Sequence, residues 1–174
     1  MIDQFIEVLQ YTIPSIITGA VAYFFFLNHS KNEDNKRNFI LLKEDKKVTI
    51  PLRLQAYERM TLFMERINPS KLLLRVTPTG EDKNLYVHKL IQSIEQEFEH
   101  NTAQQIYMSE KCWSIIITSK NATTQIIKKT AEDLSITSAQ ELREGILQRM
   151  VNSAPPSTTA LSFIKDEVNK SKQE

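Results

Sequence analysis

The chain has 174 residues, of which 25% are charged, and a formal net charge of +1. A charge this close to neutral lacks the basic surface of a nucleic-acid-binding domain, so we expect no nucleic-acid partner. A single cysteine, Cys112, excludes an internal disulfide and fits a reducing compartment. The presence of only three glycines favours helices over a fold built from strands and tight turns.

The first element is an uncharged run from Val8 to Asn28, which ends in Tyr-Phe-Phe-Phe-Leu. A helix needs about 20 mostly apolar residues to cross the hydrocarbon core of a bilayer. A cleaved signal peptide would begin with basic residues, but Asp3 and Glu7 precede this run. A buried helix of a globular domain is the other alternative, and it would normally be shorter. The run predicts a transmembrane anchor over 1–30, with the span at about 8–28.

The charges that follow the run predict its orientation. No basic residue precedes the run, whereas the stretch after it contains Lys31, Lys36, Arg37, Lys43, Lys46 and Lys47. The positive-inside tendency then places the N-terminus outside and the remainder of the chain in the cytoplasm. Acidic residues are interleaved with the basic ones, so we expect 31–47 to be a charged, solvated juxtamembrane linker. The lipid bilayer is the first predicted partner.

Helical periodicity predicts one all-α cytoplasmic domain of about four to five helices over 48–170, followed by a polar tail at 171–174. Residues 48–51 are expected to be an extended entry, because proline disfavours the helical conformation of the residue before it. A strong helix is predicted over 52–67, and Asn68-Pro69-Ser70 ends it.

Four more helices are predicted beyond it. Apolar residues at helical spacing from Val87 to Phe98 predict an amphipathic helix of about 16 residues. Ser109 is a favourable N-cap for a long helix that continues to about Leu134. Lys120 and Thr124 interrupt the apolar stripe of that helix, so we expect its middle to face solvent or a partner. The tetrapeptide 137–140 matches a capping box, which would begin the next helix, and Pro155-Pro156 separate the last one.

The helix predicted at 52–67 has two interpretations. Its glutamates and arginines fall on adjacent stripes, and its wide apolar arc indicates burial on two sides. It is either an ordinary bundle helix with a solvated charged edge, or an interface with another subunit or protein, where arginine, tyrosine and methionine are enriched. The candidate interface residues are Arg53, Tyr57, Glu58, Arg59, Glu65 and Arg66.

A second candidate is a polar corner formed by His100, Asn101, Gln105 and Tyr107. Such residues could bind a small polar ligand, or they could satisfy helix ends and loop backbone. No phosphate-binding glycine loop or zinc-ligand spacing is present, so we predict no catalytic residue, cofactor or metal ligand. Cys112 is expected to lie in the core rather than to act as a redox centre.

Two segments resemble a known family: PLRLQAYERMTLFMERINPSKLLLR and EFEHNTAQQIYMSEKCW. They are similar to an uncharacterised single-pass membrane protein family of Bacteroidota, a domain of unknown function, and the likeness extends over essentially the whole chain. The resemblance implies a bacterial origin and a location in the inner (cytoplasmic) membrane. It implies no activity, and it gives no residue a catalytic role.

Two hypotheses for function remain. The first is a non-enzymatic scaffold or protein-interaction module at the inner membrane, which binds a protein partner or forms a homo-oligomer. The alternative is a ligand-binding or enzymatic domain, with a polar pocket near His100 and Gln105 together with Arg53, Glu58 and Arg59. Mutually close polar groups in a concave pocket would favour the second hypothesis, and scattered charges on a convex domain would oppose it.

Overall fold

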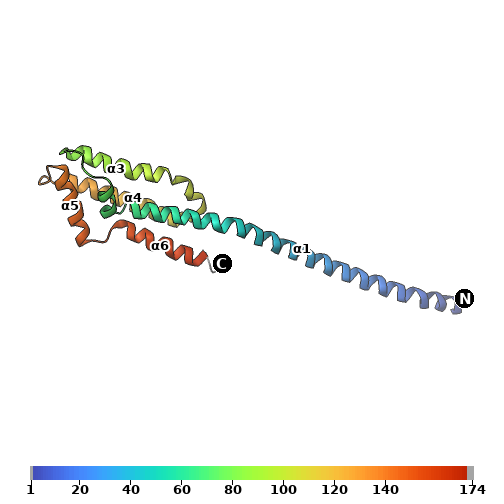
Figure 1. Cartoon of the computed structure of the whole chain (residues 1–174). Helices are drawn as coiled ribbons and strands as arrows, with labels where there is room; N and C mark the ends of the chain where they lie inside the picture. The colour runs from blue at the N-terminus through green and yellow to red at the C-terminus, as the bar shows by residue number, and fades with distance from the viewer. Residues whose placement is uncertain (1, 172–174) are drawn as a thin grey trace. The chain divides into compact units, whose positions relative to one another are not determined.

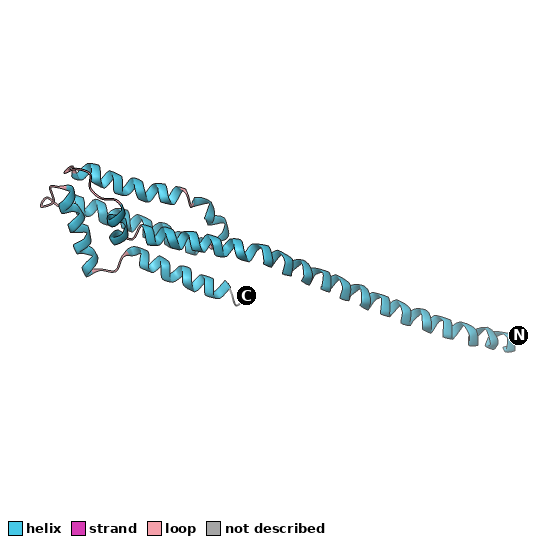
Figure 2. Ribbon diagram, in the orientation of Figure 1, coloured by secondary structure: helices cyan, strands magenta, loops and turns pink. Residues whose placement is uncertain are grey.

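A computed structural model describes residues 2–171, and its regular elements are all helices, as predicted (Figures 1 and 2). Side chains are described for only part of these residues, and those of 2–13 and Ser15 are outside the description. The elements are α1 (Ile2–Arg66), α2 (Pro69–Arg75), α3 (Lys83–Glu99), the 3-10 helix η1 (Thr102–Tyr107), α4 (Glu110–Ala131), α5 (Ala139–Asn152) and α6 (Pro156–Ser171).

The chain forms two compact units that meet between Thr49 and Ile50. We call them the N-terminal segment (residues 2–49) and the helical domain (residues 50–171). Within its described residues the helical domain contains the end of α1, then α2 to α6 and η1. That is more than the four to five helices expected, because the short elements α2 and η1 have too few residues for a periodic pattern to show.

The described part of the N-terminal segment is helical and exposes its apolar side chains. Four consecutive aromatic residues, from Tyr23 to Phe26, are each between 66% and 74% exposed. Successive helical residues are about 100° apart around the axis, so these four rings lie on all sides of the helix. Neighbouring helical turns therefore cover only a small part of their surface.

The predicted membrane span receives no support from the structure. Within the part of the chain that is described, no helix is both long enough and apolar enough to cross a membrane. The predicted span at 8–28 lies partly outside the described side chains, which are missing for residues 8–13 and 15.

The extended entry expected at 48–51 is wrong, because α1 continues through Pro51. Proline cannot donate a hydrogen bond to the carbonyl of Lys47, and in a helix interior it costs about 3 kcal/mol. The packing of the following turns offsets this cost, since Ala56 and Met60 are completely buried. The stretch 31–47, expected to be a linker, is also part of α1, and its described charged side chains are exposed.

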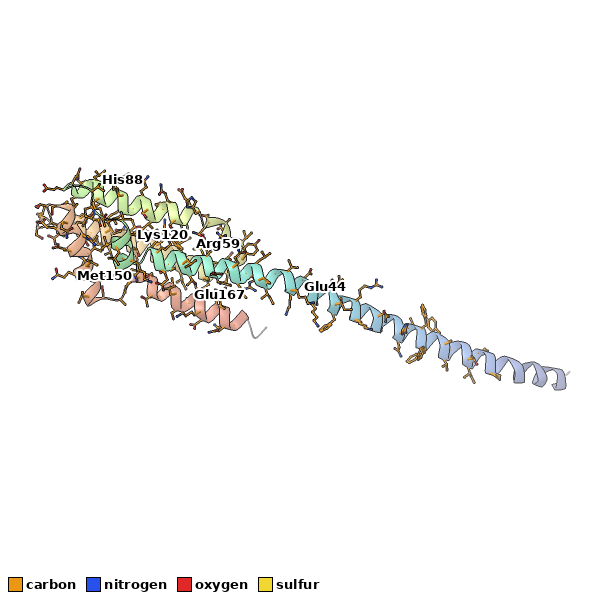
Figure 3. The ribbon with its side chains drawn as sticks, in the orientation of Figure 1. Glu44, Arg59, His88, Lys120, Met150 and Glu167 are labelled. Carbon is orange, nitrogen blue, oxygen red and sulfur yellow. The ribbon has the colours of Figure 1, made fainter. Side chains whose placement is uncertain are left out.

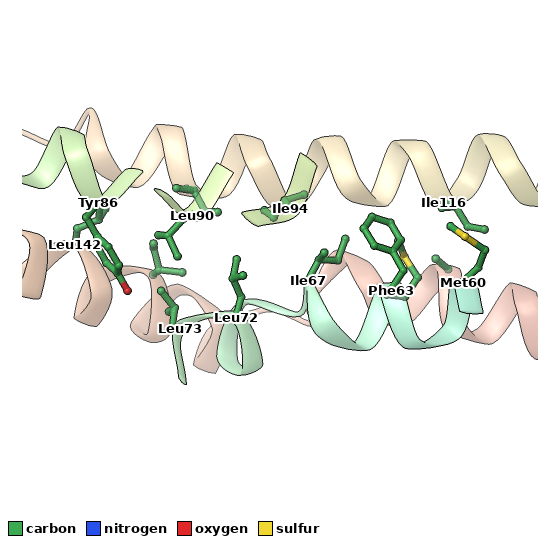
Figure 4. Packing of buried hydrophobic residues seen from close by; sticks show 14 of the residues in the cluster. Met60, Phe63, Ile67, Leu72, Leu73, Tyr86, Leu90, Ile94, Ile116 and Leu142 are labelled. Atoms are coloured by element: carbon green, nitrogen blue, oxygen red, sulfur yellow. The ribbon is translucent and has the colours of Figure 1, made fainter. Parts of the chain in front are cut away.

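The core of the helical domain is a continuous row of apolar side chains from most of its helices (Figure 4). Phe63 comes from α1, Ile67 directly follows that helix, and Leu72 comes from α2. Leu90 comes from α3 and Ile116 from α4, and all five side chains are fully buried. Helix α4 packs against α3, α5 and α6, so it is the central helix of the domain.

Side-chain caps fix where several helices begin. The side chain of Asn68 accepts a hydrogen bond from the backbone N–H of Ser70, and Pro69 opens α2. Ser109 caps α4 as predicted, because its Oγ accepts a bond from the N–H of Cys112 (3.1 Å). The capping box of α5 lies one residue later than expected, with Ser138 at the N-cap.

Lys120 is buried, contrary to the prediction that the middle of this long helix faces solvent or a partner. Its residue is only 8% exposed. Its Nζ lies 2.7 Å and 2.8 Å from the two carboxylate oxygens of Glu95, and 4.6 Å from the ring centroid of Phe98. A cation over an aromatic face and beside a carboxylate is stabilised enough to be tolerated in the core.

Candidate functional site

The six candidate interface residues of α1 lie in three different environments. Tyr57 is only 2% exposed, so it belongs to the core rather than to a surface. Its hydroxyl donates a hydrogen bond to Oε1 of Glu167 in α6 (2.8 Å) and accepts one from Nη2 of Arg53 (3.4 Å). Arg53 and Tyr57 therefore connect α1 to α6 inside the domain.

The carboxylate of Glu167 (labelled in Figure 3) is the centre of this connection. Besides the Tyr57 hydroxyl, Oε1 accepts a hydrogen bond from the backbone N–H of Ser109 (3.2 Å). Burial alone would raise the pKa of Glu167, but hydrogen bonds from Tyr57 and Ser109 outweigh it and the pKa is lowered. Burial, reinforced by the facing carboxylate, raises the pKa of Tyr57 to about 12.

Cys112 is fully buried, as predicted. Burial raises the pKa of its thiol to about 12, and the neighbouring carboxylate of Glu167 adds to this increase. The thiolate is the reactive form of cysteine, so a thiol that stays protonated at neutral pH is a poor nucleophile and metal ligand. Cys112 contributes packing rather than chemistry.

The second environment is a groove between α1 and the end of α3, of about 450 Å³, which we call the α1–α3 groove. It brings together residues from both predicted sites, although they are far apart in the sequence. Gln105 and Tyr107 of the polar corner do not line it. Its lining residues are Gln55, Glu58, Arg59, Leu62, Arg66, Glu97, His100 and Asn101.

Most of the polar groups on the α3 side of this groove already have partners. Nε of Arg66 lies 3.0 Å from Oε2 of Glu97, and Nη1 of Arg75 lies 3.9 Å from the same oxygen. The side-chain amide of Asn101 donates a hydrogen bond to the backbone carbonyl of Glu97 (2.8 Å). These contacts stabilise the wall of the groove.

Glu58 and Arg59 differ from these residues. Both are exposed, and neither forms a hydrogen bond or an ion pair with another described residue. Arg59 is labelled on α1 in Figure 3. Leu62, which is 55% exposed, lines the same groove. The α1 side of the groove therefore presents two charges of opposite sign and one apolar side chain to its surroundings.

The third environment is the junction between α1 and α2. There the carboxylate of Glu65 pairs with the ammonium group of Lys71. Both side chains are substantially exposed, and ion pairs of this kind contribute little to stability. Glu65 is therefore engaged within the chain.

Two further cavities lie at the described surface of the domain. One, of about 400 Å³, separates α1 from α6 and is lined in part by Leu54, Ile164 and Val168. The other, of about 560 Å³, lies beside the start of α5 and contains Asp133 and Glu141. Hydrogen bonds from Ser135 lower the pKa of Asp133, and bonds from Thr137 and Ser138 lower that of Glu141, because both carboxylates accept local backbone bonds.

Metal chemistry is not indicated by the residues that are described. Among them, no group of three or more His, Cys, Asp and Glu side chains is arranged to hold a metal ion. The one functional residue type that sequence reasoning missed is the internal carboxylate, Glu167. Its partners Tyr57 and Ser109 lie far from it in the sequence, so no local pattern could have shown it.

Residues 3–171 match the model of a family of unknown function, DUF7935, and the chain belongs to that family. Neither the curated proteins nor the solved structures contain a match to this chain. The match confirms the resemblance to an uncharacterised family over almost the whole chain. The bacterial origin and the membrane location implied by that resemblance stay predictions.

Proposed function

We propose that this chain is a non-enzymatic interaction module, held at the inner face of a bacterial cytoplasmic membrane by its uncharged run. Residues 8–28 would embed in the bilayer with the N-terminus outside, and the helical domain would present the α1–α3 groove to a protein partner in the cytoplasm. The observation that carries this proposal is the set of exposed aromatic side chains at 23–26.

The hydrocarbon core of a bilayer is the environment that would best remove those side chains from water. Burying one large apolar side chain is worth about 2 kcal/mol, so several exposed in succession represent a considerable free energy that only an external environment can recover. Because the rings lie on all sides of the helix, a partner with one flat face would leave some of them in water. A bilayer surrounds a helix completely.

Support for an interaction role comes from how the polar groups of the domain are used. The carboxylates of Glu95 and Glu167 bind side chains of neighbouring helices, and the thiol of Cys112 is buried with a raised pKa. The described polar groups without partners at the α1–α3 groove are exposed, and they include the opposite charges of Glu58 and Arg59 near the exposed Leu62. That combination is typical of the rim and core of a protein interface.

Fractionation tests the membrane part of the proposal. The full chain, with a C-terminal tag, should sediment with membranes and resist an alkaline carbonate wash. The variant I16D/I17D places two charges near the middle of the run, where each costs about 3 kcal/mol of insertion, and it should be released. The matched control F39D/I40D, outside the run, should stay in the pellet. Wild-type protein that washes off would overturn the membrane part.

Orientation is tested with a topology reporter fused to the C-terminus. Activity is expected only from a reporter that works in the cytoplasm. Activity from one that works across the membrane would reverse the orientation. The basic residues after the run predict the first outcome.

Site-specific photo-crosslinking tests the interaction part. A crosslinking residue at Leu62, in the groove, should give discrete adducts with a protein. The control position, Leu134, is 96% exposed but lies away from the groove, and it should give none. Equal labelling from both positions would contradict a specific interface.

A second candidate function is the binding of a small anionic ligand in the same groove. The observation that favours it is the gathering of Arg59, Arg66 and His100 at one concave site. A titration of the full chain with a panel of small carboxylates and phosphates should show saturable binding that Arg59→Ala abolishes. Saturable binding would replace the protein partner with a ligand, whereas its absence favours the interaction module.

A further inference from the structure

We infer that the partner bound in the α1–α3 groove is a second copy of this chain, with the two α1 helices antiparallel about a twofold axis between Glu58 and Arg59. The inference rests on the interaction role proposed above. Only the part of α1 that belongs to the helical domain (residues 50–66) pairs in this way.

The first argument is the pattern of side chains along α1. Leu52, Gln55, Arg59 and Leu62 recur at spacings of three and four residues, so they form one stripe along the helix. All four are exposed, and the leucines at the two ends are 40% and 55% exposed. Side chains at such spacings form a ridge that can pack against a neighbouring helix.

The second argument is charge. Glu58 and Arg59 are adjacent, opposite in sign and without an ionic partner among the described residues. A surface that carries both signs side by side complements itself when it is rotated by 180°. In a twofold interface a contact from residue i to residue j is always accompanied by the contact from j to i. Each Glu58 would therefore pair with the partner's Arg59, and both pairs would form together.

The third argument is that a single alignment of the two antiparallel helices gives each residue of the stripe a contact in the partner. With the axis between Glu58 and Arg59, Leu62 lies opposite the partner's Gln55. The partner's Leu52 is three residues further along, which is about 4.5 Å at 1.5 Å per residue. Each Leu62 therefore meets the partner's Leu52 within one helical turn. The same register that pairs the charges also buries the leucines.

The walls of the groove do not compete for these charges. Glu97 already pairs with Arg66 and Arg75, and Asn101 is bonded to the backbone of α3. Charge complementarity mainly determines which partner and which register are chosen. A second copy carries the complementary charges at the required spacing.

The inference is tested on the full chain by combining charge reversal with disulfide crosslinking. The crosslinking is carried out in isolated membranes or in the soluble fraction, wherever the chain is found. The reporter is the variant Q55C/L62C. Its two cysteines lie seven residues apart on one helix, roughly 10 Å along the axis, which is too far for an internal disulfide. Cys112 is buried and does not react. We expect a strong dimer band, and about tenfold less from the control Q55C/L134C.

Further reversals in the reporter background give the decisive result. Glu58→Arg or Arg59→Glu alone creates two like-charge pairs across the axis, so each should reduce the dimer yield about tenfold. Mixing these two single variants, or combining both reversals in one chain, restores the opposite-charge pairs and should restore the yield. Circular dichroism should show unchanged helicity in all variants, because neither residue has a partner within the domain.

Two results would overturn the inference. One is equal crosslinking by the reporter and its control. The other is a loss in the single variants that neither mixing nor the double reversal restores, which would indicate a different protein or a small ligand in the groove. Either result leaves the photo-crosslinking and fractionation outcomes intact, so failure of the dimer and failure of the proposed function are distinguishable.

Discussion

Helix α1 carries large aromatic residues in both compact units, and only the helical domain covers them. Phe25 in the N-terminal segment is 74% exposed, whereas Phe63 in the helical domain is fully buried. The two residues are chemically identical and belong to the same helix. The difference is that Phe63 has Phe98 of α3 beside it, with ring centroids 5.7 Å apart. Both phenylalanine side chains are hydrophobic, but only Phe63 is shielded from water by other parts of the same chain.

The largest expected effect tests this contrast directly. Phe63→Ala should lower the free energy of unfolding of the helical domain by about 4 kcal/mol, because it removes a buried ring and leaves a cavity. Phe25→Ala should leave that free energy unchanged within about 0.5 kcal/mol. Chemical denaturation of the full chain, followed by the fluorescence of Trp113, measures both. Equal effects would mean that Phe25 is covered by the domain.

Replacing the buried Lys120 should lower the free energy of unfolding more than replacing an exposed lysine, by a smaller margin than for the phenylalanines. Lys120→Ala removes the ion pair with Glu95 and the contact with the ring of Phe98, and should lower the free energy of unfolding by about 2 kcal/mol. Lys43→Ala, an exposed lysine of the N-terminal segment, is the control, with an expected change below about 0.5 kcal/mol. A stabilised Lys120→Ala variant would show that burial of this cation is unfavourable overall.

Alkaline pH should distinguish Tyr57 from the exposed Tyr23. The pKa of Tyr57 is raised from 10.0 to about 12 in the folded chain. Its stabilisation is therefore complete below pH 10 and is lost as the pH rises to about 12, because the unfolded chain releases the proton first. Cys112 adds a loss of the same sign that begins near pH 9.

Denaturation midpoints from pH 8 to pH 12 measure this loss. Tyr57→Phe should remove the part that begins near pH 10 and keep the part due to Cys112. Tyr23→Phe, which removes no contact of the helical domain, is the control for the loss of a tyrosine hydroxyl. An identical profile for Tyr57→Phe would show that the hydroxyl is accessible to solvent.

The smallest effect concerns two helical glycines. A Cβ at Gly145 would lie 2.9 Å from Cδ1 of Ile136 and 3.1 Å from Cγ2 of Thr130, whereas a Cβ at Gly19 would have no neighbour within 4 Å. Alanine gains about 1 kcal/mol of helix propensity at either site. At Gly145 the crowding offsets that gain, so Gly145→Ala should change the midpoint little.

Gly19→Ala, without crowding, should raise the helicity of the N-terminal segment. Circular dichroism of the full chain measures that change, and thermal denaturation measures the change at Gly145. A marked destabilisation by Gly145→Ala would mean that the side chain of Ile136 cannot move aside.

The parts of the fold that depend on residues adjacent in the sequence were predictable. The break at Asn68-Pro69 and the cap at Ser109 are local, and both were confirmed. Pro51 misled the prediction because the local preference of proline was outweighed by packing of the turns after it. The prediction for Lys120 was wrong because a helical hydrophobic pattern counts every lysine as a polar, solvent-facing residue. The carboxylate and the aromatic ring that accommodate Lys120 belong to another helix.

The candidate site was predictable to the same extent. A short periodic pattern placed Glu58 and Arg59 on one edge of a helix, and His100, which the alternative hypothesis grouped with them, lines the same α1–α3 groove. Tyr57 was assigned to the same surface, but its hydroxyl bonds to Glu167, 110 residues away, and the ring is buried. Only the arrangement of α1 against α6 determines that contact.

The proline inside α1 has a mechanical consequence. Pro51 lies two residues beyond the boundary between the two compact units, and it cannot form the backbone hydrogen bond that every other residue type could form there. A helix pulled along its axis gives way first where its hydrogen-bond ladder is incomplete. Tension applied to the N-terminal segment should therefore be relieved near Lys47 by local unwinding, before it reaches the packed core around Met60 and Phe63.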